Sequence, residues 1–397
     1  MSFSTTYKSG LFNRSFILLT ASSFLFFFNM HAFILLPVWI KQLGGSESDI
    51  GFIMGATSFS TIFSTPFAGF IVDRHDKKKL LLLGSALLVL STIPFAILNS
   101  LGPLFYVLRV LHGFAFSLFF VSAGTLITEV STKEKRTQAL GIFGVFTIIN
   151  YAFAPYLGRK IVELYSFDHY FIFISVIGIL SLPFIAFLKI NKVIDDKTQS
   201  TEDSYITDII KRPTVIIPAI TLMFAGAGFI PTLTFLPVFS LGLNITQYEI
   251  FFIWYTISVL FIRLALGWIP DKIGKIKTVV PSLILFSISI LYLGFARDKN
   301  DFIIAGILFG FGHGFIYPTL YAIVIDNSRI SERGTVFSIC SVAFTIGGMT
   351  GAFIYGLIAE AFGFYTMYRL MGVVCIAGFL IFILYNLKNI LNTGIAK

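Results

Sequence analysis

Charge is scarce in this sequence. Of its 397 residues only 12% are charged, whereas 56% are hydrophobic and 17% are aromatic. Soluble domains carry roughly 25% charged residues, so this chain has about half of what a water-facing surface needs. The composition fits lipid as the solvent, where an apolar exterior is not penalised. It therefore excludes an ordinary soluble globular protein.

Cysteines and catalytic motifs are also nearly absent. Cys340 and Cys375 are the only cysteines, and both lie in apolar runs, which indicates buried inert thiols. The sequence contains no His-x-x-x-His set, no Gly-x-Ser-x-Gly turn and no phosphate-binding loop. We therefore expect no enzyme, no metal site and no cofactor. For lack of a nucleotide-binding domain we do not expect an ATP-driven pump either.

The net charge of +9 does not indicate a nucleic-acid partner, because the basic residues lie in short turns between apolar runs. If the N-terminus is cytoplasmic, 21 of the 29 Lys and Arg fall on the cytoplasmic side and six on the other. The remaining two, Arg109 and Arg263, lie inside spans. By the positive-inside rule both termini are expected in the cytoplasm.

Windows of about 20 apolar residues predict twelve transmembrane helices. The expected spans are residues 15–40, 48–71, 80–99, 103–128, 138–158, 169–189, 214–239, 248–269, 278–296, 302–325, 335–358 and 365–387. The first is too long for the apolar core of a secretory signal, so we expect it to be retained. One long polar segment divides the spans six and six. We expect an N-terminal six-helix bundle at 1–189, a cytoplasmic linker at 190–212 and a C-terminal six-helix bundle at 213–397.

A charged turn occurs twice in the chain. Residues 69–79 read GFIVDRHDKKK, and residues 267–277, which begin 198 positions later, read GWIPDKIGKIK. Shorter pairs repeat near the same offset: LPV at 36–38 and 236–238, and HGF at 112–114 and 313–315. Together they indicate a duplicated array. Two parallel halves related by an axis along the membrane normal are a known transporter plan.

The repeated turn resembles the signature of the major facilitator superfamily, Gly-x-x-x-Asp-[Arg/Lys]-x-Gly-x-[Arg/Lys]-[Arg/Lys], between spans 2 and 3. The first copy matches at Gly69, Asp73, Arg74, Lys78 and Lys79, but Asp76 stands where Gly is usual. The second copy keeps Gly267, Asp271, Lys272, Gly274 and Lys277. The likeness covers nearly the whole chain.

Two further motifs are similar to those of bacterial drug-efflux-type members of that family. Arg109, His112 and Gly113 resemble the Arg-x-x-Gln-Gly motif, with His in place of Gln. The APYLG sequence at 154–158 resembles the Gly-Pro-x-x-Gly-Gly motif of drug/proton antiporters, with Ala for the first Gly and Arg159 for the last. The resemblance implies an all-α membrane protein of twelve helices in two bundles, with spans 1, 4, 7 and 10 lining a central cavity.

The two signature turns are expected to form a conformational gate. A carboxylate gains about 0.3–1 kcal/mol near a helix N-terminus, and the following basic residues are placed to pair with acids such as Glu129 or Asp326. For Lys77 and Lys275 we expect a role in topology alone. The predicted gate residues are Gly69, Asp73, Arg74, Lys78, Gly267, Asp271, Lys272, Gly274 and Lys277.

Polar side chains inside spans are the candidate substrate or proton residues. A guanidinium within a span costs about 2.5–3.5 kcal/mol to insert, so Arg109 and Arg263 are expected to face a cavity or a partner. For Arg263, near the end of its span, snorkelling to the interface is the alternative. Histidine titrates near neutral pH, which suits a coupled proton, although a lone His in an apolar helix is commonly a packing residue. The predicted set is Arg109, His112, His31, Asn29, His313, Tyr317, Asn150 and Arg263.

No carboxylate lies near the middle of any span, which favours a neutral, zwitterionic or anionic substrate. The sequence thus predicts secondary active export of a small amphipathic or organic-anion compound by alternating access, coupled to protons, by a monomer in a bacterial inner membrane. An uptake carrier for a small polar nutrient is the alternative. A membrane-embedded enzyme or a transport-inactive receptor is more remote. The expected partners are the substrate, a coupling proton and the lipid bilayer.

Overall fold

The computed structural model describes residues 13–131, 135–189, 206–329 and 332–395, and within these ranges the chain forms helices and short turns without a β-strand. In chain order the helices are α1 (Arg14–Ala32), the 3-10 helix η1 (Phe33–Leu35), α2 (Leu36–Gln42), α3 (Glu47–Arg74), α4 (Lys77–Thr92), the 3-10 helix η2 (Ile93–Ile97), α5 (Pro103–Glu129), α6 (Arg136–Ile148), α7 (Asn150–Leu164), α8 (Phe167–Ala186), α9 (Ile206–Ile210), α10 (Pro213–Gly242), α11 (Glu249–Ala265), α12 (Ile269–Ile273), α13 (Lys275–Leu293), α14 (Lys299–Asp326) and α15 (Arg333–Ile395).

Nine helical stretches in the described part of the chain are long and apolar enough to cross a membrane. One of them, Arg333–Leu387, is 55 residues long and contains two spans, because Gly363 interrupts its helix at φ +78°. The 28-residue α3 and the 17-residue α11 fill the two remaining places in the expected order. The all-helical membrane fold predicted from the sequence is confirmed.

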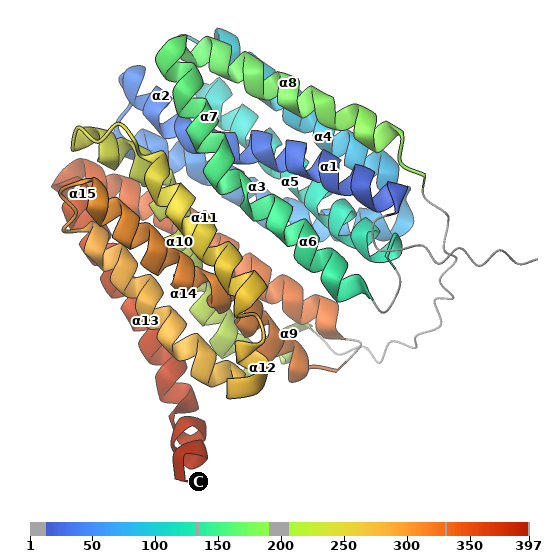
Figure 1. Cartoon of the computed structure of the whole chain (residues 1–397), viewed down its shortest axis with the longest axis vertical. Helices are drawn as coiled ribbons and strands as arrows, with labels where there is room; N and C mark the ends of the chain where they lie inside the picture. The colour runs from blue at the N-terminus through green and yellow to red at the C-terminus, as the bar shows by residue number, and fades with distance from the viewer. Residues whose placement is uncertain (1–12, 132–134, 190–205, 330–331, 396–397) are drawn as a thin grey trace, which may run out of the picture.

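The helices gather in two groups (Figure 1). The N-terminal half comprises α1 to α8, in which α5 packs against α3 and α4, and α8 packs against α1. The C-terminal half comprises α10 to α15, in which α10 packs against α15, and α14 packs against α11 and α13. The predicted domain bounds 1–189, 190–212 and 213–397 stay a prediction, and residues 190–205 lie outside the described ranges.

Local sequence explains where several helices begin. The side chain of Ser46 accepts from the backbone N–H of Asp49, and Asp49 accepts in return from the N–H of Ser46, so α3 starts with a capping box. Asp298 and Asp301 form the equivalent box at α14. These side chains satisfy backbone donors that a helix end leaves free.

Glycines allow the closest helix contacts. The backbone of α10 passes so near Gly347 of α15 that a Cβ there would collide with the carbonyl oxygen of Met223, and one at Gly226 would collide with that of Phe344. Small residues permit such backbone approach inside a membrane, where van der Waals packing holds helices together. The two glycines therefore allow α10 and α15 to pack backbone against backbone.

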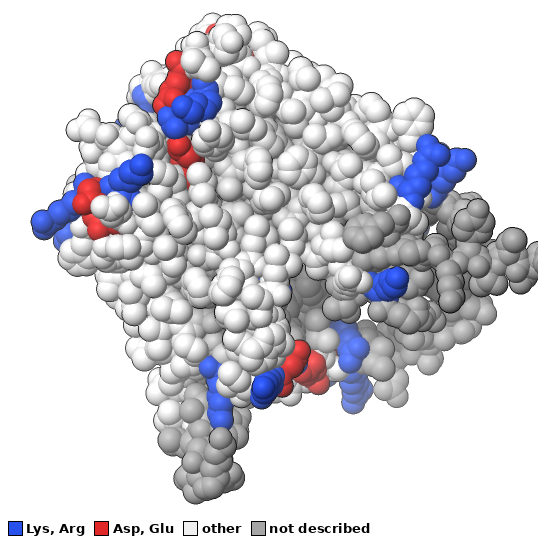
Figure 2. All heavy atoms as spheres, in the orientation of Figure 1, with Lys and Arg blue, Asp and Glu red and all other residues white. Residues whose placement is uncertain are grey.

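The bundle has two ends, which we name by their turns. The signature face carries residues 69–79 and 267–277, and the opposite face carries the turns at 43–46 and 294–298. Figure 2 shows Lys, Arg, Asp and Glu gathered toward the ends of the bundle, with a broad band of other residues between them. Large apolar side chains such as Phe63, Leu90 and Leu264 are exposed, at 63–75% of their surface. This arrangement suits an apolar belt facing lipid chains.

Candidate functional site

A chain of aromatic contacts joins the two halves at mid-height. The ring of His31 on α1 stacks on Tyr151 of α7 at 3.8 Å between centroids. Tyr151 meets Tyr255 of α11 edge-on at 5.7 Å, which crosses from one half to the other. The hydroxyl of Tyr255 is hydrogen-bonded to Nδ1 of His313 on α14 at 3.2 Å. Two of the histidines predicted for the site, far apart in sequence, are therefore linked through two tyrosines.

Phe229 of α10 completes an aromatic wall around this chain. Its ring stacks on His313 at 4.3 Å and lies 6.2 Å from both Tyr151 and Tyr255. Offset and edge-on arrangements at these separations are the favourable ones for aromatic pairs. We call His31, Tyr151, Phe229, Tyr255, Arg263 and His313 the central cluster.

Arg263 extends from the C-terminal half toward the N-terminal half. A side chain at Gly144 of α6 would begin 2.9 Å from Nη1 of Arg263. The guanidinium lies within electrostatic range of Tyr255, His313 and Tyr317, and its Nε is buried without a hydrogen-bond partner. Arg263 forms no ion pair with any described residue. The alternative expectation, that it snorkels outward to the membrane interface, does not fit this position.

Tyr317, also predicted for the site, lies beside the central cluster. Its ring contacts Tyr321 on the same helix at 4.4 Å, and the hydroxyl of Tyr321 is hydrogen-bonded to Ser341 at 2.7 Å. This group extends the polar side of the cluster along α14 toward the signature face.

Arg109 and His112 occupy a separate place, inside the N-terminal half. Arg109 on α5 is 5% exposed, and its guanidinium lies 5.1 Å from the ring centre of Phe33. His112 is fully buried, with its ring 4.1 Å from the same phenylalanine and its Nδ1 3.4 Å from the hydroxyl of Ser91. Nε and Nη1 of Arg109 and Nε2 of His112 have no partner among the described residues. The two side chains thus form a buried polar site with several unsatisfied nitrogen atoms, distinct from the central cluster.

The two predicted asparagines support helix packing. Asn29 donates to the backbone oxygen of Ile174 at 2.7 Å and accepts from Thr92 at 3.1 Å. Asn150 donates to the backbone oxygens of Phe24 and Phe146 at 2.9 and 3.1 Å, while its own side-chain oxygen is unpartnered. Buried amides with such partners hold helices in register.

An ion pair that the sequence analysis missed joins the halves at the opposite face. Arg159 of α7 donates from Nε and Nη2 to the two carboxylate oxygens of Glu249 on α11, at 2.8 and 2.7 Å. Both side chains are at least 90% buried, and Arg159 also pairs with Glu163 one turn along its own helix. A basic residue at the end of span 5 and an acid at the start of span 8, on the same side of the membrane, were the available signal.

A second polar contact between the halves lies on the same face. The carboxylate of Glu360 on α15 accepts from the backbone N–H of Ser48, in the first turn of α3, at 3.1 Å. A helix N-terminus is a favourable place for an anion. We call this contact and the Arg159–Glu249 pair the opposite-face contacts.

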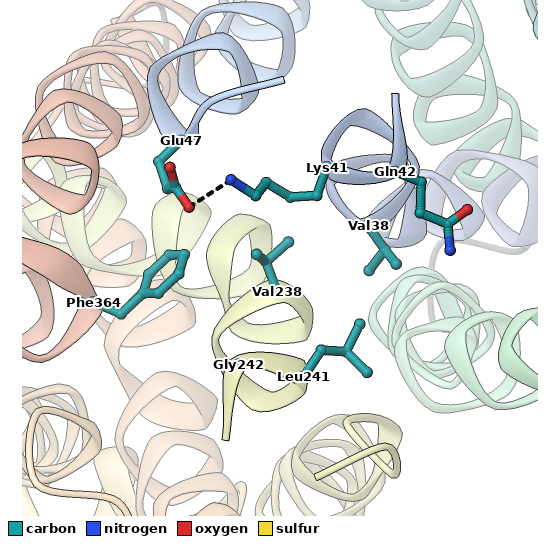
Figure 3. A pocket seen from close by; sticks show the side chains of 8 residues that line it. All are labelled: Val38, Lys41, Gln42, Glu47, Val238, Leu241, Gly242 and Phe364. Carbon is teal, nitrogen blue, oxygen red and sulfur yellow. Dashed lines mark ion pairs between the residues drawn. The ribbon is translucent and has the colours of Figure 1, made fainter. Parts of the chain in front are cut away.

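The opposite face is also hollowed by a pocket of about 380 Å³ (Figure 3). The repeated residues Val38 and Val238 line it from the two halves, and Lys41 reaches across it to Glu47 at 2.9 Å. The duplicated LPV sequences therefore meet near the boundary of the halves.

The signature turns differ in how they start the next helix. Asp76 caps α4, because its carboxylate accepts from the backbone N–H of Lys78 and of Lys79. Gly274, at the matching place before α13, has φ +106°, a backbone conformation that residues other than glycine rarely adopt. The departure from the family signature at Asp76 is thus a change from a glycine turn to a side-chain cap.

The other predicted gate residues lie on or near the exposed surface of the signature face. Lys78 donates to the backbone oxygens of Ala186, the last residue of α8, and of Leu188 just beyond it, at 2.6 and 2.8 Å. Arg74 and Lys272 lie over the rings of Phe70 and Trp268. Gly267, Asp271 and Lys277 are exposed and Gly69 is half-buried, whereas the side chain of Asp73 lies outside the described part.

Two ion pairs form beside these turns, each within one half. Lys77 pairs with Glu129 at 3.0 Å, and Lys275 pairs with Asp326. The two lysines thus have ion-pair partners in addition to the topological role expected for them. Since neither pair crosses between the halves, neither holds the signature face closed in this state.

A family model for the Major Facilitator Superfamily matches residues 17–280 and 219–390. The chain is 24% identical over 342 residues to a mouse synaptic vesicular amine transporter; the match covers 84% of this chain but 65% of that protein, which is less than two thirds of its length. It is 22% identical over 373 residues to the multi-drug resistance efflux pump PmrA of Streptococcus pneumoniae, covering 90% of this chain and 92% of the pump.

Solved structures agree on the fold. A crystal structure of a POT family transporter in complex with a thioalcohol-conjugated peptide superimposes with a TM-score of 0.80 and 13% identity, over 94% of this chain and 96% of that one. The resemblance to the superfamily predicted from the signature turns is confirmed. The chain belongs to the Major Facilitator Superfamily, a family of transporters and not of enzymes, and it is a multi-pass membrane protein.

Proposed function

We propose that this protein exports a small amphipathic or anionic organic compound across a bacterial cytoplasmic membrane, as a monomeric secondary active transporter coupled to protons. The observation that carries the proposal is the central cluster, in which side chains from both halves meet at mid-membrane. A site shared by two rocking halves is the arrangement that alternating access requires. The similarity to an efflux pump supports export.

The contacts between the halves support alternating access. The two opposite-face contacts join the halves on that side of the molecule. Toward the signature face, the ribbons of α6 and α11 run apart (Figure 1). In the other state the opposite-face contacts break, and the two signature turns close their own side of the molecule. The predicted gate residues act in that second state.

The signature face is the cytoplasmic one in this proposal. In the topology predicted from the sequence, the segments on this side hold 21 Lys and Arg against six on the other, which sets orientation by the positive-inside rule. Both termini are then cytoplasmic, and the state described is open to the cell interior. Single cysteines at exposed Lys277 and Lys299 test this with a membrane-impermeant maleimide on intact cells, because the native Cys340 and Cys375 are buried. Labelling at residue 299 alone supports the orientation, and labelling at residue 277 alone refutes it.

Substrate and proton occupy different places in the molecule. The central cluster holds the substrate between the halves. His112, buried beside Arg109 and without an acidic partner among the described residues, carries the coupled proton. Histidine suits this task because its charge changes within the physiological pH range.

Proteoliposomes with an imposed pH gradient test the whole proposal. Purified full-length protein is reconstituted, and uptake of labelled neutral and anionic amphipathic compounds is followed with the gradient inward, outward and absent. We expect accumulation only with a proton gradient directed against the substrate. Accumulation with a gradient in the same direction as the substrate would establish the uptake carrier instead, and equal transport without any gradient would refute proton coupling.

A further inference from the structure

The central cluster has a charge pattern that selects among substrates. Arg263 brings a permanent positive charge into it, and Arg263 has no ion-pair partner among the described residues. In the described part of the chain, Asp and Glu lie in turns or near the ends or kinks of helices, away from this cluster. A guanidinium inside the membrane normally has a counter-ion. An anionic substrate can therefore act as the counter-ion of Arg263.

The nonpolar part of the cluster is aromatic and comes from both halves. Phe229, Tyr255 and His313 belong to the C-terminal half and Tyr151 and His31 to the N-terminal half, and the rings of the two halves meet edge-on at 5.7 and 6.2 Å. A planar aromatic ligand can stack on these rings or meet them edge-on, whereas a saturated ligand makes no aromatic–aromatic contact with them. The wall therefore favours a planar aromatic body.

The spacing along α11 sets the length of the ligand. Arg263 lies eight residues after Tyr255, which is about 12 Å along the helix axis, and its long side chain covers part of this distance. A ligand that reaches both must extend from the guanidinium to the aromatic wall. A naphthalene ring with one carboxylate meets this requirement, because its anion and its planar body lie at opposite ends.

We infer that the central cluster binds an aromatic carboxylate, with the carboxylate on Arg263 and the ring system against Phe229 and Tyr151. This inference rests on the proposed transport function and names the substrate class of the same site. The guanidinium offers a planar pair of donors to the carboxylate, and charge-assisted pairs of this kind are the strong ones. The hydroxyls of Tyr255 and Tyr317 add polar groups close to the anion.

Four matched probes test the inference by direct binding, measured by titration calorimetry on the full-length protein in lipid nanodiscs. They are 2-naphthoate, its saturated analogue decalin-2-carboxylate, the neutral 2-naphthylmethanol and the cationic 2-naphthylmethylammonium. We expect 2-naphthoate to bind tightest, by about tenfold or more over the ammonium compound, as expected for one charge-assisted contact. Equal binding of the two ions, or no binding of any probe, overturns the inference.

Variants locate the anion. R263A should weaken 2-naphthoate by about tenfold or more and leave 2-naphthylmethanol nearly unchanged, whereas R263K should keep most of the preference for the anion. F229L should weaken 2-naphthoate more than its saturated analogue. K299A removes one exposed charge from the end of α14 and serves as the matched control. An anion preference that survives R263A refutes the assignment, and the neutral probe shows whether that variant is folded.

The binding and transport results separate the two proposals. If 2-naphthoate binds in the expected order but is not moved in proteoliposomes, the transport function fails and the binding site stands. If the protein transports a cationic or neutral compound and R263A leaves the rate of that transport unchanged, the transport function stands and the aromatic-carboxylate class is wrong.

Discussion

Arg159 and Glu249 form a two-point ion pair between the halves, with Nε to Oε2 at 2.8 Å and Nη2 to Oε1 at 2.7 Å. They lie 90 residues apart in sequence and are both buried at the opposite face. A paired fork of this kind fixes the angle at which two helices meet, as well as their distance. Opening of the opposite face must break this ion pair. The pair therefore contributes to the balance between the two states of the transporter.

Glu249→Gln should shift this balance toward the state that is open at the opposite face. Among the described residues, the substitution leaves Arg159 one ion-pair partner, Glu163. The closed state should therefore lose less than the 3–5 kcal/mol, roughly, that breaking a buried pair costs. A cysteine replacing Val38, which is 8% exposed in the pocket of Figure 3, reports the opening. We expect its reaction with an impermeant maleimide to accelerate by roughly tenfold, the equivalent of about 1.4 kcal/mol.

The control for this variant is Glu163→Gln. Glu163 also pairs with Arg159, but it lies on α7 like Arg159 itself, and its side chain is 43% exposed. Its loss should change the labelling rate little, because it does not join the halves. Equal acceleration by both variants would mean that the net charge near Arg159, and not the link between the halves, controls opening.

Glu360→Gln should act in the same direction but more weakly. The carboxylate accepts one backbone N–H at the start of α3, and solvent screens an exposed group of this kind. Since Glu360 and Glu249 share no partner, their effects on the logarithm of the labelling rate should add in the double variant. The labelling assay at residue 38 measures this, with Asp168→Asn, an exposed acid in the first turn of α8, as the control. A double variant no faster than Glu249→Gln would show that Glu360 does not restrain opening.

The two signature turns should respond differently to alanine and glycine. Asp76→Ala removes the cap of α4 and should destabilise the protein by about 1 kcal/mol, whereas Asp76→Gly should cost only a few tenths. Gly274→Ala forces a side chain into φ +106° and should cost about 1–3 kcal/mol. Thermal unfolding followed with a thiol-reactive dye on the buried Cys340 and Cys375 measures these changes. If Asp76→Gly is as damaging as Asp76→Ala, the carboxylate is not acting as a helix cap.

The sequence predicted the fold because lipid imposes a length on apolar runs. Twelve such runs and a repeated turn give the helices and their order without reference to packing. The Arg159–Glu249 pair was missed because it depends on how α7 packs against α11, which a single sequence does not reveal. Arg109 illustrates a further limit: α5 is apolar on nearly every face, so its periodicity does not indicate which way the arginine points. Only Phe33 and the buried position identify its surroundings.

His112→Ala should uncouple transport from protons without abolishing it. Nε2 of His112 is buried without a partner among the described residues, within electrostatic reach of Arg109, and away from the central cluster. A proton taken up there would affect the halves without touching the substrate. We expect accumulation driven by a pH gradient to fall by about tenfold or more, while exchange of labelled for unlabelled substrate at equilibrium, which needs no net proton movement, stays within about twofold of wild type.

His169→Ala is the matched control, because His169 lies on the exposed first turn of α8, where its Nδ1 is 2.8 Å from the hydroxyl of Ser166. It removes a titratable ring without touching either buried site, so accumulation and exchange should both persist. The proton assignment fails if His112→Ala accumulates substrate as the wild type does. If accumulation is lost in His31→Ala or His313→Ala with exchange retained, the coupled proton belongs to the central cluster, and substrate and proton then compete for one site.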